Sequence, residues 1–466
     1  MLRSFRFRLA AIVALGLAVR WITVFAFYKK LSPPPVDLTD NTWYWLQAKL
    51  VAHGDGFANP IYWWRDGVIR HSAGHPPLYT AYLAMFARLG FDTPLAMRLA
   101  SGLLGALGVG LVGGATKRVS GSERAALLAA LFAALYPNLW INDGLILSES
   151  MFVPLVAGLI WATYLLLDRH DLRSAALVGL IVGLSCLTRS ESQLYFVTLL
   201  PLVTLWGLRR KPIVRRLQLL GAAGLIGALV VSPWVIKNMT TFEHPVGLAI
   251  GAGFVLEVAN CDDTYHGQLL GYWSDRCGAG WADPGTKGCV AVRSDGPGAG
   301  AQRGKTNLVC DESVVELVKR KRATQYISDH TSELPKVVLA RVGRIWNVYR
   351  PLQGVDLDTF FERRGHRAAQ AALWSFYGLG VLAAVGFVTL WRRRIPVLPF
   401  VTIIGIVTFT AATTMGITRY RVGAEVVWVV LAGIGADAVW SRLRRPPIAD
   451  TAIEAASSSP ISAVER

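Results

Sequence analysis

The chain has 466 residues, of which 53% are hydrophobic and only 17% are Asp, Glu, Lys or Arg. Soluble globular domains carry about 25% charged residues, so this composition excludes an ordinary soluble domain and indicates a polytopic membrane protein. The formal net charge of +17 does not indicate nucleic-acid binding, because the basic residues gather in short loops between apolar runs, where they set the orientation of membrane helices.

Apolar runs of about 20 residues recur along the chain and predict about ten membrane-spanning helices. The first run lacks a small-residue cleavage site, so we interpret it as a retained span rather than a signal peptide. The basic clusters all fall on the cytoplasmic side if both termini are cytoplasmic, as the positive-inside rule requires. The predicted spans lie near residues 8–28, 95–116, 124–141, 145–167, 174–188, 192–208, 217–236, 370–391, 396–415 and 422–441.

The first outer loop, residues 29–94, contains two short helical patterns. In the first, Trp43, Leu46 and Leu50 recur at helical spacing after Asp40. The second, "HPPLYTAYLAMFARLG" (75–90), begins with proline and ends with glycine, which are boundary signals. Its helix of about 14 residues would be ~21 Å long, too short for a ~30 Å hydrocarbon core. We therefore predict two helices that lie on the outer interface.

A long polar region, residues 237–368, contains four of the five cysteines. An even set of cysteines in one soluble segment predicts two disulfides on an oxidising, extracytoplasmic side, with the pairing open. A metal site is the weaker alternative, because no spacing is C-x-x-C. The Gly-rich stretch 296–304 follows no clear strand and is interpreted as a flexible loop. The four residues are Cys261, Cys277, Cys289 and Cys310, while Cys186 lies within an apolar run.

These patterns predict an all-α polytopic membrane protein with about ten transmembrane helices, two interfacial helices and a small disulfide-containing extracytoplasmic region. Residues 311–330 and 337–351 of that region are expected to be helical. The predicted division is an N-terminal membrane module (1–236), the extracytoplasmic region (237–368), C-terminal membrane helices (369–445) and a disordered cytoplasmic tail (446–466).

Ionisable residues near the predicted spans collect at their outer ends. Charges at membrane depth are costly, so such a cluster is a site hypothesis by default. We expect these side chains, which come from separate segments, to converge on one face of the bundle. They are Asp40, Arg98, Asp143, Glu149, Arg189, Glu191, Arg419 and Arg421.

Each of these residues also has a purely structural interpretation. Asp40, taken alone, is better explained as a helix cap. Glu149 can pair with an arginine, and Arg421 and Glu425 are spaced four apart on a helix, where they can pair with each other. His75, before two prolines, can be a turn residue. The combination favours a functional site over these separate explanations.

Arginines beside a carboxylate and aromatic rings suit glycosyl transfer from a lipid phosphate. Arginine matches the geometry of phosphate oxygens, and Asp40 would take the proton from an acceptor hydroxyl. Aromatic rings such as Tyr44 would stack on sugar faces and limit water. No cofactor is required by this scheme, because cations can stabilise the leaving phosphate, although a divalent cation stays open.

Six stretches resemble the membrane glycosyltransferases of the C superfamily, close to the branch of protein O-mannosyltransferases and lipid A aminoarabinose transferases. They follow that family's order and cover most of residues 38–206 and 419–433. The stretches are "TDNTWYWLQAKLVAHGDGF", "HPPLYTAYLAMFARLG", "MRLASGLLGAL", "LYPNLWINDGLILSESMF", "GLIVGLSCLTRSESQLYF" and "RYRVGAEVVWVVLAG".

The resemblance implies a polyprenyl-phosphate sugar donor, transfer at the extracytoplasmic face of the plasma or inner membrane, and inversion at the anomeric carbon. Asp40 falls on the family's first-loop catalytic acid and Glu149 on its "LTE" glutamate. Arg189 falls on its "LTR" arginine, and Arg419 and Arg421 fall on its C-terminal "RYR" pair. We expect these three arginines to bind the donor phosphate. The residues that we expect to support the site or bind substrate are Glu149, Glu191, Asp143, His75, Tyr44 and Arg98. Asn41 follows Asp40 where many members carry a second acid, and Gly423 replaces a usual proline.

Two other classes of protein were weighed. A lipid or sugar transporter would show paired broken helices and polar residues near the midplane, whereas here the charges gather at one face. A structural assembly subunit would have lost the catalytic carboxylate. The sugar remains open among arabinose, mannose, galactose and aminoarabinose. The acceptor remains open among cell-wall glycan, lipoglycan, glycolipid and protein hydroxyl, and nucleic acid is not an expected partner.

Overall fold

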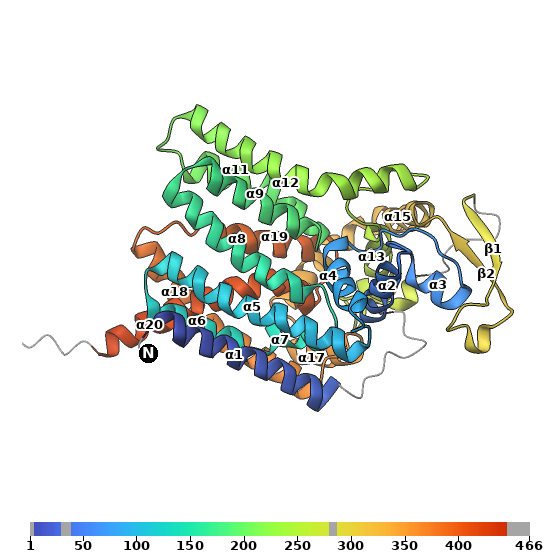
Figure 1. The fold of residues 1–466 in the computed structure, drawn as a ribbon, viewed down its shortest axis with the longest axis horizontal. Coiled ribbons are helices and arrows are strands. Elements are labelled where there is room, and N and C mark those ends of the chain that lie inside the picture. Colours follow the sequence, from blue (N-terminus) through green and yellow to red (C-terminus); the bar gives the residue numbers. More distant parts are fainter. Residues whose placement is uncertain (1–3, 29–38, 279–286, 445–466) are drawn as a thin grey trace, which may run out of the picture.

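The computed structural model describes residues 4–28, 39–278 and 287–444, and it shows a bundle of long helices that carries a cap of shorter elements at one end (Figure 1). Six helices in the described part are long and apolar enough to cross a membrane. They are α1 (Phe5–Thr23, continued by a π-helical turn to Tyr28), α5 (Pro94–Ser120), α8 (Glu149–Arg169), α12 (Ile213–Thr241), α18 (His366–Arg392) and α20 (Val422–Leu443).

The predicted count of ten spans is not confirmed. Helices α6 (Glu123–Leu135) and α7 (Pro137–Gly144) bend by 44° at their junction and make a seventh span only if they are counted together. Helices α9 (Leu172–Cys186) and α19 (Leu398–Thr413) have 15 and 16 residues, about 22–24 Å against a ~30 Å core.

The predicted span 192–208 is also interrupted. It consists of a 3-10 turn, η2 (Ser190–Gln193), two short helices, α10 (Leu194–Val197) and α11 (Leu199–Pro201), and a π-helical segment, η3 (Leu202–Gly207). Pro201 has no backbone N–H to donate, which is consistent with the break in the regular ladder.

The centre of the bundle is formed by α8 and α20, which are mostly buried, whereas α1, α12 and α18 are mostly exposed. Glycines allow α20 to approach α18 closely. A methyl group added at Gly435 would collide with the carbonyl of Leu382, and one added at Gly386 would collide with that of Leu431. Small residues of this kind bring helix backbones together in membranes. These contacts hold the middle of α20, the helix that follows the turn carrying Arg419 and Arg421, close against α18.

The first outer loop contains three short helices, α2 (Asp40–His53), α3 (Pro60–Asp66) and α4 (Pro77–Arg88). The structure confirms helices at both predicted places and adds α3. Their predicted position on the membrane interface stays a prediction. Part of this loop, 29–38, the stretch 279–286 and the predicted tail, 446–466, lie outside the described residues.

The long polar region, 237–368, is not wholly helical, so the all-α prediction was wrong there. A hairpin pairs β1 (Cys289–Arg293) with β2 (Thr306–Cys310), and Cys289 faces Cys310 in its register. The Gly-rich stretch joins these strands; it remains a connection, but it does follow a strand. The helices of the region are α13 (Ala252–Ala259), α14 (Asp262–Tyr265), α15 (Glu312–Asp329), α16 (Leu334–Ile345) and α17 (Pro351–Phe360), with short 3-10 turns η4 (Asp275–Cys277), η5 (Gly300–Gln302) and η6 (Thr331–Glu333).

The four cysteines of this region form two disulfides, Cys261–Cys277 and Cys289–Cys310. The predicted disulfides are present, and the buried Cys186 is free. Disulfides persist in oxidising compartments, so this end of the molecule is consistent with an extracytoplasmic location.

The hairpin region is attached to the first outer loop by a buried carboxylate. Glu312, the first residue of α15, accepts hydrogen bonds from Asn59 Nδ2 at 2.7 Å and from Ser72 Oγ at 2.9 Å. Because buried carboxylates need such partners, this contact fixes the loop that follows α2 and positions the surroundings of Asp40.

Candidate active site

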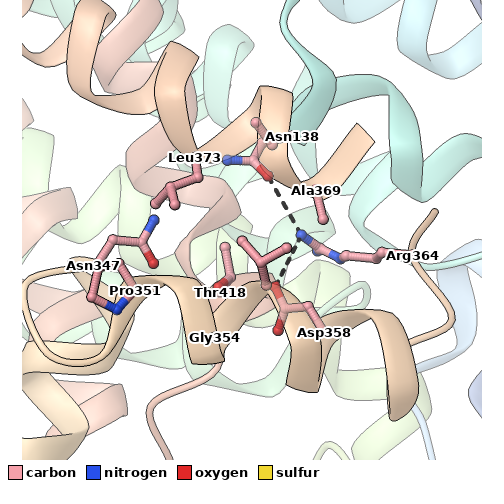
Figure 2. Close-up of a pocket in the computed structure, with 11 residues that line it drawn as sticks. Asn138, Asn347, Pro351, Gly354, Asp358, Arg364, Ala369, Leu373 and Thr418 are labelled. Atoms are coloured by element: carbon pink, nitrogen blue, oxygen red, sulfur yellow. Dashed lines mark hydrogen bonds and ion pairs between the residues drawn. The ribbon is translucent and has the colours of Figure 1, made fainter. Parts of the chain in front are cut away.

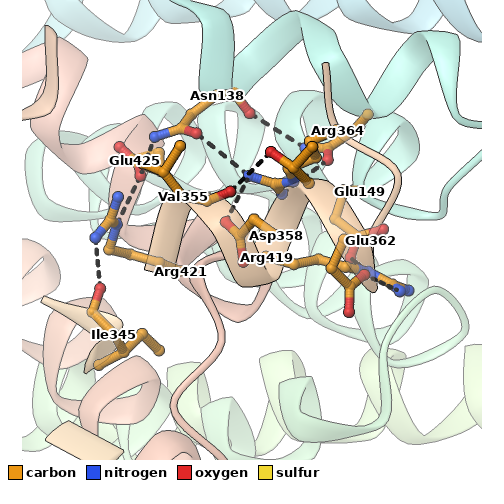
Figure 3. A network of polar contacts seen from close by, with 12 residues as sticks. Asn138, Glu149, Ile345, Val355, Asp358, Glu362, Arg364, Arg419, Arg421 and Glu425 are labelled. Carbon is orange, nitrogen blue, oxygen red and sulfur yellow. Dashed lines mark hydrogen bonds and ion pairs between the residues drawn. The ribbon is translucent and has the colours of Figure 1, made fainter. Parts of the chain in front are cut away.

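Arg419 is the centre of a charged cluster at the outer end of the bundle. It lies in a 3-10 turn, η7 (Thr418–Arg421), that leads into α20. Its guanidinium contacts three carboxylates from distant parts of the chain: Nε donates to Glu149 at 2.5 Å, Nη1 to Glu362 at 3.3 Å, and Nη2 to Asp40. Its side chain is 12% exposed. Figure 3 shows Arg419 directed toward Glu149 and Glu362.

Glu149 joins the two arginines of the cluster. This first residue of α8 is fully buried and also accepts a hydrogen bond from Arg189 Nη1 at 2.6 Å. Arg189 in turn donates from Nε to Glu191 at 2.5 Å. One buried carboxylate therefore holds two guanidinium groups side by side, and each guanidinium is a planar fork of donors that suits phosphate oxygens.

Asp40 is the most exposed carboxylate of the cluster. Its side chain is 33% exposed, compared with 10% for Glu362 and 0% for Glu149. Besides Arg419, it contacts His75 Nε2 at 3.4 Å. The N-cap position of α2 is occupied by Thr39, so the structure does not support the capping role considered for Asp40.

The pKa of Asp40 reflects two opposing influences. Burial alone would raise it, but the charge of Arg419, followed by that of His75 and the hydrogen bonds from both, outweighs burial and holds the pKa of Asp40 well below its usual range. Asp40 is therefore ionised at neutral pH, which is the state that a general base requires.

Aromatic rings surround this carboxylate. The ring of Tyr44 lies 4.8 Å from that of His75 and 5.0 Å from that of Tyr79, measured between centroids. Trp43 meets His75 edge-on at 5.6 Å. Gly74 allows this packing, because a methyl group there would lie 2.6 Å from the Trp43 ring. The rings hold His75 against Asp40 and shield that side from water.

Arg421 lies apart from the cluster, as Figure 3 shows. It is fully buried, pairs with Glu425 at 2.6 Å, and has its guanidinium 3.8 Å from the Phe376 ring centre. Glu425 also accepts hydrogen bonds from Tyr136 and Asn138. This geometry supports the alternative helix pair with Glu425 and argues against the phosphate-binding role predicted for Arg421.

Asp143 and Arg98 are also away from the cluster. Asp143 pairs with Arg20 of α1 at 2.7 Å, and both side chains are 1% exposed. Arg98 donates to the carbonyl oxygens of Gly144 at 3.0 Å and Tyr28 at 2.9 Å. These contacts connect α1, α5 and α7. Asp143 and Arg98 therefore stabilise the packing of these helices, and the structure does not bring them to Asp40.

Glu362, which follows α17, is the residue of the cluster that sequence reasoning missed. It lies in "FFERRGH", within the polar region, and belongs to no motif. Next to it, Arg364 contacts Asp358 at 3.7 Å and Asn138 at 3.4 Å. Figure 2 shows Asn138, Asp358 and Arg364 among the residues that line a small pocket. One signal for Glu362 was present in the sequence: it is an acid directly followed by two arginines, shortly before the predicted span 370–391.

Within residues 4–28, 39–278 and 287–444, no group of three or more His, Cys, Asp or Glu side chains is arranged to hold a metal ion. The positive charge of the described cluster comes from Arg189 and Arg419. The site can therefore bind an anionic ligand through arginine nitrogens, and its most exposed carboxylate, that of Asp40, can accept a proton.

Comparison with known sequences gives one family match. Residues 74–236 match the model of the dolichyl-phosphate-mannose-protein mannosyltransferase family. No curated protein matches the chain by sequence. The matched segment includes Glu149, Arg189 and Glu191 but neither Asp40 nor Arg419.

Solved structures share the fold over nearly the whole chain. The Archaeoglobus fulgidus oligosaccharyltransferase in its apo form matches at 13% identity and a TM-score of 0.52, over 94% of this chain and 51% of that one. The same organism's oligosaccharyltransferase AglB, in complex with an inhibitory peptide and a dolichol-phosphate, matches at 13% identity and a TM-score of 0.54, over 98% and 52%. The chain thus spans about half the length of these proteins.

ArnT from Cupriavidus metallidurans, bound to undecaprenyl phosphate, has a TM-score of 0.39 and 15% identity, over 93% of this chain and 79% of that one. The family match and the shared fold confirm the resemblance to membrane glycosyltransferases of the C superfamily.

Proposed function

Because the chain has the fold of C-superfamily membrane glycosyltransferases, we propose that it transfers a sugar from a polyprenyl-phosphate donor to an extracytoplasmic acceptor hydroxyl. The observation that carries this proposal is the pair of guanidiniums, Arg189 and Arg419, joined by Glu149 and placed beside the exposed carboxylate of Asp40. The match to a dolichyl-phosphate-mannose family and the fold shared with a protein solved with dolichol-phosphate support this class of donor.

The donor phosphate binds at Arg419 and Arg189. In the described structure each of the three nitrogens of Arg419 already contacts a carboxylate. A phosphate therefore takes over at least one of these contacts, and it gains charge-assisted hydrogen bonds in return. Glu149 keeps the two guanidiniums aligned while this exchange takes place.

Asp40 acts as the general base. The acceptor oxygen attacks the anomeric carbon, its bond to that carbon forms as the bond to the phosphate oxygen breaks, and the hydroxyl proton moves to Asp40. Attack opposite the leaving phosphate inverts the anomeric configuration. The phosphate leaves as an anion, which the arginines stabilise.

Donor binding also improves the base. Arg419 is the principal partner that holds the pKa of Asp40 below its usual range, against the effect of burial. When a phosphate shares the charge of Arg419, that influence weakens and the pKa of Asp40 rises. Asp40 then accepts a proton more readily, at the moment when the donor is in place.

The outer face is the proposed side of the reaction. The elements that carry or border the site, α2, α4 and α13, lie at the same end of the molecule as the hairpin (Figure 1), and that region holds both disulfides. Disulfides are typical of oxidising compartments, so the acceptor is expected on the extracytoplasmic side.

A transporter is the second candidate, because the bend between α6 and α7 and the interrupted stretch 190–207 resemble broken transporter helices. The cluster favours the enzyme, since Glu149 and Arg419 lie at the ends of their candidate spans rather than in the middle, and Asp40 begins the short helix α2. Membranes that contain the protein, incubated with a panel of polyprenyl-phosphate sugars, test the choice. Release of polyprenyl phosphate with formation of a glycosylated product is expected, whereas transbilayer movement of an intact donor would reject the enzyme.

A further inference from the structure

The charged cluster carries more negative than positive groups. Four carboxylates, those of Asp40, Glu149, Glu191 and Glu362, surround only two guanidiniums. Counted over these six side chains, the cluster has a surplus of two negative charges when every acid is ionised. An arriving phosphate adds to this surplus, so the site cannot take it up favourably unless one carboxylate gives way or is protonated.

Glu362 is the carboxylate that can release its contact with Arg419 at the smallest cost in free energy. Its contact with Arg419 is the longest of the three, at 3.3 Å. Glu149 is fully buried and shared by both arginines, so removing it would leave two like charges side by side. Asp40 is needed as the ionised base. Glu362, in contrast, touches only the Nη1 edge of Arg419 and lies in the segment between α17 and α18 rather than within a helix.

The backbone around Glu362 holds its side chain in the site. Arg363 adopts φ of 53°, a left-handed conformation that is costly for a residue with a Cβ. The residues on either side of it, Glu362 and Arg364, both have buried side chains that contact the polar network. Figure 3 shows Glu362 and Arg364 on the two sides of this turn. Strain of this kind persists where the surrounding structure over-determines a position, often at functional sites.

We propose that Glu362 is a positioning residue that holds Arg419 in the donor-free site and releases Nη1 of Arg419 to the donor phosphate, with uptake of a proton by Glu362. This inference rests on the proposed function and deepens it. In the donor-free enzyme, Glu362 occupies the place of one phosphate oxygen on the guanidinium. In the donor complex, the neutral acid remains nearby and no longer repels the phosphate.

The surroundings of Glu362 are consistent with this exchange. Burial raises its pKa, and the charges of Asp358 and Asp40 act in the same direction, while Arg419 and Arg364 oppose them; the net shift is upward. A group whose pKa is raised in this way takes up a proton more easily than its neighbour Asp40, whose pKa is lowered. Loss of the contact with Arg419 would raise the pKa of Glu362 further.

The experiment measures the dissociation constant of undecaprenyl phosphate for the purified full-length protein and its variants at pH 8 and at pH 5.5. Glu362→Gln keeps the shape but removes the competing charge, and it should bind the probe about tenfold more tightly at pH 8. Glu362→Asp keeps the charge on a shorter side chain, so its affinity for the probe should lie between those of the unmodified protein and Glu362→Gln. Asp356→Asn is the matched control, because it removes an exposed charge from α17, the helix that precedes Glu362, where Asp356 pairs with His366.

The pH comparison separates this proposal from a structural role. The advantage of Glu362→Gln should shrink at pH 5.5, where Glu362 of the unmodified protein is more often protonated. The same measurements with a polyprenyl phosphate diester, whose single negative charge is the same at both pH values, exclude titration of the probe as the cause. Equal or weaker binding by Glu362→Gln, or an advantage that does not change with pH, would overturn the proposal. If the unmodified protein does not bind the probe, or if Arg419→Lys binds it equally well, the proposed donor site itself fails.

Discussion

Replacing Arg419 by lysine tests the arrangement of the donor site. Three nitrogens of one planar guanidinium reach Asp40, Glu149 and Glu362 from fixed directions. A lysine ammonium is a single point charge on a flexible stem and cannot keep all three contacts or bind a phosphate in a bidentate way. Charge-assisted hydrogen bonds contribute about 1.5–3 kcal/mol each, so Arg419→Lys should weaken binding of undecaprenyl phosphate by about ten- to a hundredfold.

The assay is a direct binding titration with purified protein, accompanied by thermal unfolding. Unfolding should become easier by only ~1–3 kcal/mol, because the positive charge is kept near the three acids. Arg442→Lys is the control, since Arg442 is exposed at the far end of α20, the helix that follows the turn carrying Arg419. Binding of the probe by Arg419→Lys at the unmodified affinity would refute the role of the guanidinium geometry.

Three further outcomes are expected. Alkylation without prior reduction, followed by intact-mass measurement, should label only Cys186, and two or more labels would contradict the disulfides. Arg421→Lys should lower the melting temperature, because it disturbs a buried pair, yet leave the affinity for undecaprenyl phosphate unchanged; a large loss of affinity would return Arg421 to the donor site. Reporter fusions at Lys211 and Gln302 should report the cytoplasm and the outer side, and the reverse result at either position would contradict the extracytoplasmic site.

Local sequence patterns predicted features that depend on neighbouring residues, such as the starts of helices and pairs within one helix. Prolines at Pro77 and Pro94 mark the starts of α4 and α5, where their fixed backbone angle suits a first helical turn. The four-residue spacing of Arg421 and Glu425 correctly indicated an ion pair between them. The interruption at 190–207 was not recognised. Apolar composition predicts that a segment can lie in a membrane, but it does not show whether the backbone hydrogen bonds of a helix continue through it.

Contacts between distant segments could not be derived in the same way. Arg419 and Asp40 are 379 positions apart in the chain. The predicted topology placed both at the outer ends of the spans and the family resemblance supported a shared site, but neither predicted which atoms would be in contact. Glu362 was missed because nothing near it in sequence distinguishes it from a solvated acid. The β-hairpin was missed because its two strands have five residues each and are separated by a Gly-rich stretch.

Substitution of Asp40 by asparagine, with transfer and donor binding measured on the same preparation, tests the central claim most directly. The account predicts a normally folded protein that still binds undecaprenyl phosphate, because Arg189 and Arg419 remain, but transfers sugar about 10²–10⁴ times more slowly for want of a base. Asparagine has nearly the shape of aspartate, so a loss of packing would not explain such a split. Glycosyl transfer by Asp40→Asn at close to the unmodified rate would contradict the assignment of Asp40 as the base.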